Sequence, residues 1–366
     1  MGIRQSVIGS AAGLATALAL TAGDTASGQQ IWTVPPAVGY PYTYIADLAD
    51  GNTALGANLD LDGIPQQAFT WTPQNGRVDL TLNGQPLRNT FKISGDGAYL
   101  GGNFTRYRVS DGHVDTIANP GNYARRTAKG ISGDGSKIMG TATDSRGLGA
   151  VTYTWTPQSG TQYLPMSGRF VSGQQTAGAM SRDGSTIVGT FLEGSASRGF
   201  VYREGQGYSV PVGANGVEAS AIDCVNADGS ILAGIASGAG GGLTRWVNGT
   251  PTLLSYISGY AQYAQGMSND GNVIVGLLDE LAGNNDRSFV WTPSTGTMFV
   301  EDYLRMNGIV LPVGEIIDRL IVSGDGKSFA GRFSQISGDA FVATIPGPGG
   351  MTLVVGALAF SRRRSR

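Results

Sequence analysis

The chain has 366 residues, a formal net charge of −2 and few charged side chains, which make up 14% of the sequence. Glycine accounts for 58 residues, about twice its average share. The chain lacks the Gly-X-Y period of collagen, and its recurrent apolar segments exclude a disordered polypeptide. Its basic residues are scattered except at the last five positions, so the sequence does not indicate a nucleic-acid-binding surface.

The N-terminal segment has the layout of a secretory signal. Arg4 precedes an alanine-rich apolar run over 11–22, and small residues follow through Gly28. This order of a cation, an apolar run and small residues predicts a signal peptide over residues 1–28 and therefore an exported protein. Cleavage after Ala22, Ala26 or Gly28 fits the pattern equally well.

One short pattern recurs seven times between the two ends of the chain, at a mean spacing of about 46 residues. It consists of an Asp-Gly pair, usually with serine two positions before the aspartate, and a glycine six positions after it. The aspartates are Asp50, Asp96, Asp134, Asp183, Asp228, Asp270 and Asp325. The later glycines are Gly56, Gly102, Gly140, Gly189, Gly234, Gly276 and Gly331.

The repeat predicts a unit of four short β-strands. Asp-Gly between apolar runs is typical of a tight hairpin, in which the carboxylate accepts hydrogen bonds from its own turn. A glycine inside the second strand indicates a bulge or a close backbone approach from the neighbouring unit. An aromatic third strand and a short fourth strand complete each copy. Because such a unit is the size of a propeller blade, the sequence predicts an all-β, seven-bladed β-propeller over residues 29–345.

Two segments fall outside the regular repeats. The seventh copy ends at Phe341-Val342-Ala343-Thr344 without a fourth strand, whereas Ile31-Trp32-Thr33-Val34 precedes the first copy and belongs to no unit. We expect this early segment to pair with the third strand of the last blade and close the ring, which removes free sheet edges. The insertion over 301–314 predicts a short helix and a loop.

Few residues offer catalytic chemistry. His113 adjoins Asp111-Gly112 and is expected to be a solvated turn residue, while Cys224 is expected to be a buried small hydrophobic residue. A single histidine and a single cysteine exclude a histidine-rich zinc site, a thiolate cluster and an intrachain disulfide. The glutamates are scattered, and their spacing singles out no catalytic pair. They are Glu193, Glu204, Glu218, Glu280, Glu301 and Glu315. We therefore predict no catalytic residue.

Asn58, Asp60 and Asp62 form the one metal candidate. They place oxygen ligands at alternate positions and are followed by Gly63, as in calcium loops. Phe69 stands where such a loop has its glutamate, so an ordinary polar loop is the alternative reading. No other cofactor is expected.

The long, variable pieces between second and third strands are 57–68, 141–152 and 277–288. In a propeller these connections gather on one face, so contacts with a glycan or a protein are expected there.

The C-terminal segment over 346–366 combines a proline-glycine break, the apolar run 351–360 and the arginines Arg362, Arg363 and Arg364. Its apolar run is shorter than the roughly 20 residues of a membrane-spanning helix, which suits a transient, processed tail whose arginines stay on the cytoplasmic side. The segment resembles the PEP-CTERM sorting signal of Gram-negative bacteria, although Gly347 replaces the usual glutamate. The resemblance implies processing by an exosortase-like protease and a location at the cell envelope surface or outside the cell.

Residues 45–345 resemble the extracellular HAF-repeat family, whose signature survives here as Ala68-Phe69 and Ala340-Phe341 without its histidine. No general activity is established for that family. The resulting hypothesis is a non-catalytic surface or extracellular-matrix protein, a binding or adhesion scaffold for extracellular polysaccharide or a surface protein. The alternatives are a propeller-fold carbohydrate-active hydrolase or lyase, and a structural protein without a ligand.

Overall fold

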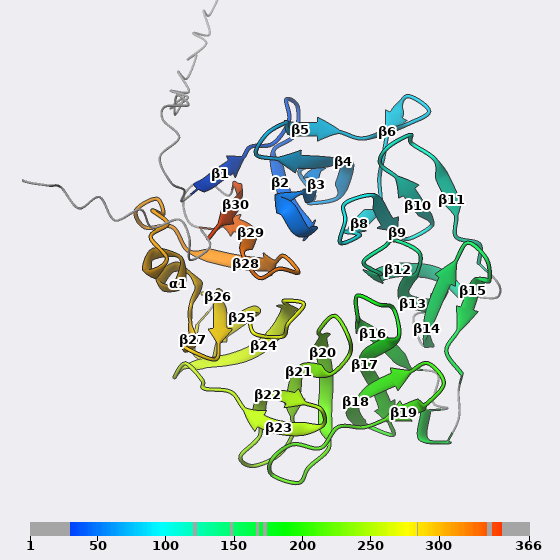
Figure 1. Cartoon of the computed structure of the whole chain (residues 1–366), viewed down its shortest axis with the longest axis vertical. Helices are drawn as coiled ribbons and strands as arrows, with labels where there is room; N and C mark the ends of the chain where they lie inside the picture. The colour runs from blue at the N-terminus through cyan, green and yellow to red at the C-terminus, as the bar shows by residue number, and fades with distance from the viewer. Residues whose placement is uncertain are drawn as a thin grey trace, which may run out of the picture.

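A computed structural model describes residues 30–119, 123–146, 149–165, 168–170, 174–283, 285–334 and 339–345. Seven four-stranded antiparallel sheets are arranged in a ring around a common axis, as predicted from the repeat (Figure 1). The predicted signal peptide and sorting tail lie outside the described residues. Within the described part, no helix is long and apolar enough to cross a bilayer.

Each blade runs from an innermost first strand to an outermost fourth strand. Blade 1 contains β2 (Tyr42–Leu48), β3 (Ala54–Leu59), β4 (Pro65–Thr72) and β5 (Gly76–Asp79); blade 2 contains β8 (Thr90–Ile93), β9 (Tyr99–Gly102), β10 (Thr105–Arg108) and β11 (Val114–Thr116). Blade 3 contains β12 (Tyr123–Ile131), β13 (Ile138–Asp144), β14 (Ala150–Thr156) and β15 (Gly160–Tyr163); blade 4 contains β16 (Gln175–Met180), β17 (Thr186–Glu193), β18 (Ala196–Arg203) and β19 (Gly207–Ser209).

Blade 5 contains β20 (Ala219–Val225), β21 (Ile231–Ala236), β22 (Gly242–Val247) and β23 (Thr250–Leu253); blade 6 contains β24 (Tyr260–Met267), β25 (Ile274–Glu280), β26 (Arg287–Thr292) and β27 (Gly296–Phe299). Blade 7 contains β28 (Ile317–Val322), β29 (Ser328–Phe333), β30 (Ala340–Thr344) and β1 (Gln30–Val34). The small hairpin β6 (Thr81–Leu82) and β7 (Gln85–Pro86) and the 3-10 turns η1 (Asp50–Asn52) and η2 (Gly168–Phe170) lie between blade strands.

The ring closes as the sequence predicts. Strand β1 is the fourth strand of blade 7 and pairs antiparallel with β30, from Gln30 opposite Thr344 to Val34 opposite Ala340. Val34 is 1% exposed and packs between blades 7 and 1. The first and last described strands therefore lie side by side, and β1 covers the edge that β30 would otherwise expose.

The repeat glycines make room for side chains and backbone of their own blade. In five blades the glycine stands directly opposite an aromatic residue of the third strand, as Gly140 opposite Tyr153. A Cβ on Gly140 would overlap this ring and the carbonyl oxygen of Thr127 on the first strand. The first strand bulges beside this pair, between Ala128 and Gly130. The predicted bulge is confirmed, but the expected approach from the neighbouring unit is wrong, because the close contacts come from the same blade.

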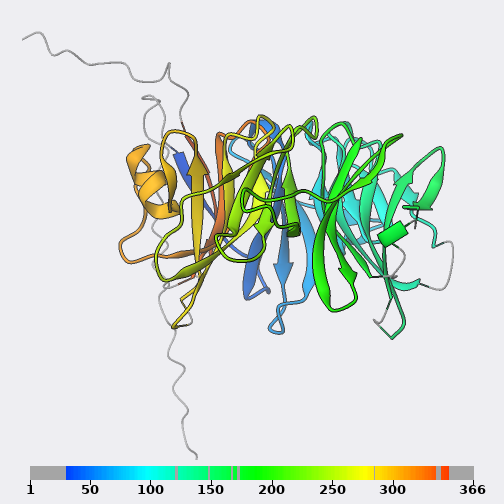
Figure 2. The ribbon, with the colours of Figure 1, turned by 90° about the horizontal axis from the view of Figure 1, so that it is seen from below.

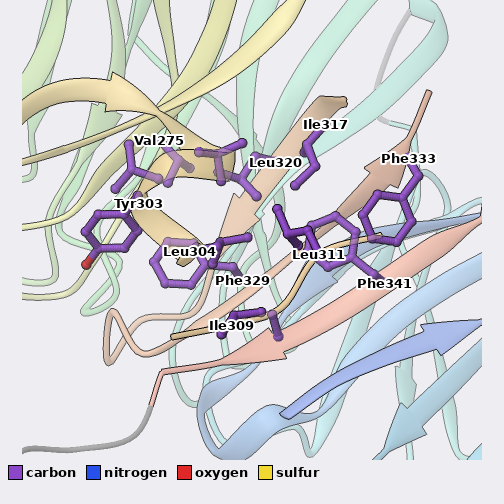
Figure 3. Close-up of a cluster of buried hydrophobic side chains, with 13 residues drawn as sticks. Val275, Tyr303, Leu304, Ile309, Leu311, Ile317, Leu320, Phe329, Phe333 and Phe341 are labelled. Atoms are coloured by element: carbon purple, nitrogen blue, oxygen red, sulfur yellow. The ribbon is translucent and has the colours of Figure 1, made fainter. Parts of the chain in front are cut away.

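The apolar core lies between adjacent blades, which fit together side by side around the ring (Figure 2). The inserted segment adds one further contact: helix α1 (Val300–Met306) places Leu304 against blade 7, beside Phe329, in the buried cluster that also contains Phe341 (Figure 3). Leu304 is fully buried. The predicted short helix is thus present, and its role is to cover the outer side of blades 6 and 7.

Candidate functional site

The two ends of the ring differ in chemistry. Each first strand ends at an Asp-Gly turn, which has the form Ser-x-Asp-Gly in five of the seven blades, and this end is called the turn face here. The second strand runs back, so the connections between second and third strands and between successive blades lie at the opposite end, the loop face. A ligand would meet different residues at each end.

The turn aspartates are structural. In blade 3, Asp134 accepts hydrogen bonds from Ser132 Oγ (2.7 Å) and from the backbone N–H of Ser136 (2.9 Å), and Ser132 Oγ accepts one from the N–H of Lys137 (2.9 Å). The Ser132 hydroxyl and the Ser136 N–H lower the pKa of Asp134. The glycine of every Asp-Gly pair has a positive φ, such as +70° at Gly135. These turns confirm the role predicted from the repeat.

Backbone hydrogen bonds link the turns of neighbouring blades in succession from blade 1 to blade 7. The Gly133 N–H donates to the Arg182 carbonyl (2.7 Å), and the Asn269 N–H donates to the Gly324 carbonyl (2.6 Å). Further links run from Asp50 to Gly95, Asp96 to Gly133, Asp183 to Ala227 and Ala227 to Asn269. The turn face is therefore a rigid collar around the channel rather than a set of free loops.

Arg182 occupies the channel at this collar. It forms an ion pair with Asp50 of blade 1, which is free to do so because Leu48 replaces the serine that holds the other turn aspartates. A Cβ on Gly95, Gly133 or Gly324 would overlap the Arg182 side chain. The glycines thus leave space for a guanidinium that spans from blade 4 to blade 1.

Above the collar, the innermost strands line a cavity of about 200 Å³, called the central pit here. Asp47 accepts backbone hydrogen bonds from Leu48 and Ile93, both at 3.1 Å, and faces Lys92 at 3.8 Å. Asp223 also lines the pit, and burial raises its pKa to about 6. Cys224 beside it is buried, as predicted. Sequence spacing did not single out Asp223, because its position depends on a bulge.

The loop face carries most of the exposed large hydrophobic side chains. They are Val38, Tyr42, Leu61, Ile64, Phe104, Val212, Val217, Tyr256, Leu281, Val310 and Val313. None of the exposed large hydrophobic residues found in the described chain lies in a Ser-x-Asp-Gly turn. The exposed apolar side chains are thus concentrated at one end of the molecule, which makes the loop face the candidate binding surface.

A groove of about 400 Å³ opens on the loop face between blades 1 and 7. Tyr42 and Leu61, which are 49% and 82% exposed, line it together with Arg332, whose guanidinium is held by Asp318. The groove includes part of the predicted variable loop 57–68. That loop is shorter than expected, since strands β3 and β4 leave only residues 60–64 between them. The other two predicted loops shrink in the same way, to 145–149 and 281–286.

The fold also brings together two glutamates, Glu193 and Glu218, which their spacing in the sequence did not identify as a pair. Arg169 Nη2 contacts Glu193 (2.6 Å) in blade 4 and Glu218 (2.9 Å) before blade 5, and Arg198 lies 3.3 Å from Glu218. Hydrogen bonds from Arg169 lower the pKa of both carboxyl groups. Both glutamates are therefore ionised at neutral pH, which suits an ion-pair network better than a proton donor.

Among the described residues, the calcium candidates and His113 do not come together with further polar side chains into a site. Asp60 accepts hydrogen bonds from the N–H groups of Asp62 (3.0 Å) and Ile64 (2.9 Å), and Asn58 is buried with its Oδ1 bonded to the Ala37 N–H. In the described part of the chain, no three histidine, cysteine, aspartate or glutamate side chains group in a way that could hold a metal ion. Calcium at this loop remains a prediction. His113 is exposed in its turn, 3.3 Å from Asp115.

Comparison with known proteins defines the class. No protein-family model matches the sequence, and no curated protein matches it. An oligogalacturonate lyase from Vibrio parahaemolyticus is similar in fold, with 13% identity and a TM-score of 0.59 over 88% of this chain and 99% of that chain.

A second oligogalacturonate lyase, in complex with manganese, has 15% identity and a TM-score of 0.60 over 88% of this chain and 95% of that one. The β-propeller domain of Cps50 (Swd1) from Myceliophthora thermophila has 10% identity and a TM-score of 0.52 over 86% and 99%. At these identities the likeness establishes the fold alone: the chain is a seven-bladed β-propeller.

Proposed function

We propose that this protein is an exported, non-catalytic scaffold at the cell surface or in the extracellular matrix, which binds an extracellular polysaccharide through its loop face. The observation that carries this proposal is the concentration of exposed apolar side chains on that face, opposite a polar collar of turns. The signal-like segment 1–28 and the sorting-like segment 346–366 support the location.

The groove between blades 1 and 7 is the proposed contact. Tyr42 offers an aromatic face with a polar hydroxyl, Leu61 offers an apolar wall, and Arg332 and Asp62 offer charged groups for hydroxyl or carboxylate substituents. Tyrosine and arginine are enriched at interfaces for this combination of packing and hydrogen bonding. A surface-protein partner would use the same residues and is an outcome of the test below.

Sedimentation of the protein with isolated envelope polysaccharide tests this function. Wild type should co-sediment, and the double variant Tyr42→Ala, Leu61→Ser should bind about tenfold more weakly or not at all. The matched control is Val78→Ser, which removes an equally exposed side chain (50%) from an outer strand. Equal binding by both variants, or capture only by a protein component of the envelope, would contradict the polysaccharide proposal.

A carbohydrate-active lyase or hydrolase is the second candidate, because Glu193 and Glu218 meet at one arginine on the loop face. The structural likeness to oligogalacturonate lyases selects the first substrate to assay. Incubation with oligogalacturonate, followed by chromatography of the products, should show no cleavage. Cleavage that the Glu193→Gln and Glu218→Gln variants abolish would replace the binding proposal with this one.

A further inference from the structure

The central pit receives one residue from the same structural position in each of four successive blades. The innermost strands of blades 3 to 6 each contain a register shift three residues before the turn serine or asparagine. The extra residues at these shifts are Lys129, Gly178, Asp223 and Gln265, and all four line the pit. A bulge re-aims its side chain and leaves the residue unpaired in the ladder, so the fold directs these groups into the cavity.

Gly178 contributes no side chain to the pit between two of these groups. Lys129 of blade 3 and Asp223 of blade 5 flank blade 4, whose bulge residue has no side chain. A Cβ at Gly178 would approach the Ile222 carbonyl oxygen to 2.8 Å, so a larger residue would disturb the neighbouring strand. The glycine therefore allows the first strands of blades 4 and 5 to pack closely.

The charges of the pit are balanced but only partly paired. Asp47 is satisfied by Lys92 and two backbone N–H groups, and Arg182 is satisfied by Asp50. Asp223, Lys129 and Gln265 have no side-chain hydrogen bond or ion pair among the described residues. A partly buried carboxylate without donors is costly, and the raised pKa of Asp223 reflects this cost. A ligand that donates hydrogen bonds to Asp223 would relieve it.

The size and the access of the pit restrict the ligand. Its volume of about 200 Å³ corresponds to about seven waters. Arg182 and turn residues such as Asn269 line its turn-face end, and we take the loop face as the side of entry. A cation would meet Lys129 and Lys92, and an anion would meet Asp223 and Asp47, whereas a neutral polyol can donate to the carboxylates and accept from the ammonium and amide groups.

We propose that the central pit binds a single monosaccharide-sized polyol, with its hydroxyl groups on Asp223, Gln265 and Lys129. This inference deepens the proposed function, since a terminal sugar residue of a polysaccharide held on the loop face could enter the pit from that side. The pit would then supply selectivity for the sugar, while the groove between blades 1 and 7 supplies contact area.

Calorimetric titration with the neutral polyols D-galactose and myo-inositol, each alone, tests the pit, with D-galacturonate as an anionic comparison and glycine as a zwitterionic comparison. At least one polyol should bind the wild type. The Asp223→Asn variant, which keeps the shape but removes the charged acceptor, should bind that polyol about tenfold more weakly, the effect of losing a hydrogen bond to a charged group. The control Asp286→Asn removes an exposed carboxylate on the loop face and should leave the titration unchanged.

Gln265→Ala serves as a second pit variant, and the thermal unfolding of each variant shows whether it is folded. Binding of glycine or D-galacturonate but of neither neutral polyol, no binding of any of the four probes, or polyol binding that survives both pit variants would overturn the inference. Failure of the two proposals is distinguishable, because the Tyr42→Ala, Leu61→Ser variant should lose the polysaccharide but retain the free polyol. Retention of the polysaccharide by that variant, with polyol binding lost in Asp223→Asn, would reject the groove and keep the pit.

Discussion

Single positions in this ring are constrained by how closely strands approach one another. Gly102 and Gly101 are adjacent in β9, yet their surroundings differ: a Cβ on Gly102 would lie 2.6 Å from the Asn89 carbonyl oxygen, while the nearest atom to a Cβ on Gly101 would be 3.5 Å away. We predict that Gly102→Ala destabilises the protein by about 1–3 kcal/mol, the cost of forced overpacking. Gly101→Ala should change the free energy of unfolding by less than about 1 kcal/mol. Urea denaturation of both variants measures the difference, and equal midpoints would refute the packing argument.

The turn aspartates should make stability depend on pH. Hydrogen bonds lower the pKa of Asp134, chiefly from the Ser132 hydroxyl, and that of Asp228, chiefly from the Ser230 hydroxyl, below the ordinary value of 3.8. Their contribution is therefore complete above pH 3.8 and is lost as the pH falls through that value towards the lowered pKa. We predict that the double variant Asp134→Asn, Asp228→Asn is less stable than wild type at pH 7 and that the difference in stability becomes smaller as the pH falls below 3.8. The melting temperatures of wild type and variant between pH 7 and pH 3 provide the measurement. A difference in melting temperature that is the same at pH 3 as at pH 7 would contradict the assignment.

The closing strand is the element on which the ring depends. Within β1, Val34 is buried between blades 7 and 1, whereas its neighbour Thr33 is exposed. We predict that Val34→Asp destabilises the protein by about 3 kcal/mol or more, because an unpaired carboxylate would enter the seam between blades. Thr33→Asp on the same strand should cost less than about 1 kcal/mol. Thermal unfolding compares them, and similar losses would mean that β1 does not seal the core.

Elements defined by local chemistry could be predicted from the sequence, whereas contacts between distant elements could not. Asp-Gly turns, the orphan strand 31–34 and the helix within 301–314 each follow from a pattern within a few residues. The Arg169 bridge between Glu193 and Glu218, and the position of Asp223 in the pit, depend on strand register and on the angle between blades. The one visible clue was Leu48, the only residue that breaks the serine or asparagine pattern before a turn aspartate and so frees Asp50.

Arg182 and Asp50 connect opposite parts of the whole ring, although they are 132 residues apart in the chain. Both side chains are partly buried, with 27% and 38% exposed, so their attraction is screened less than that of a surface pair and more than that of a core pair. We predict a coupling free energy of about 1 kcal/mol in a double-mutant cycle of Arg182→Gln and Asp50→Asn.

Arg182 of this pair also lines the central pit, so the cycle has a second readout. If Arg182 closes the channel at the collar, Arg182→Gln should raise the hydrogen-exchange rate of the collar N–H groups of Gly133 and Asn269, while the core of blade 6 keeps its protection. The ion pair would then hold blades 4 and 1 at a fixed separation at the turn face. If the free-energy effects of the two mutations are additive and the hydrogen-exchange rates of the collar N–H groups do not change, the backbone hydrogen bonds of the collar alone hold the turns in place.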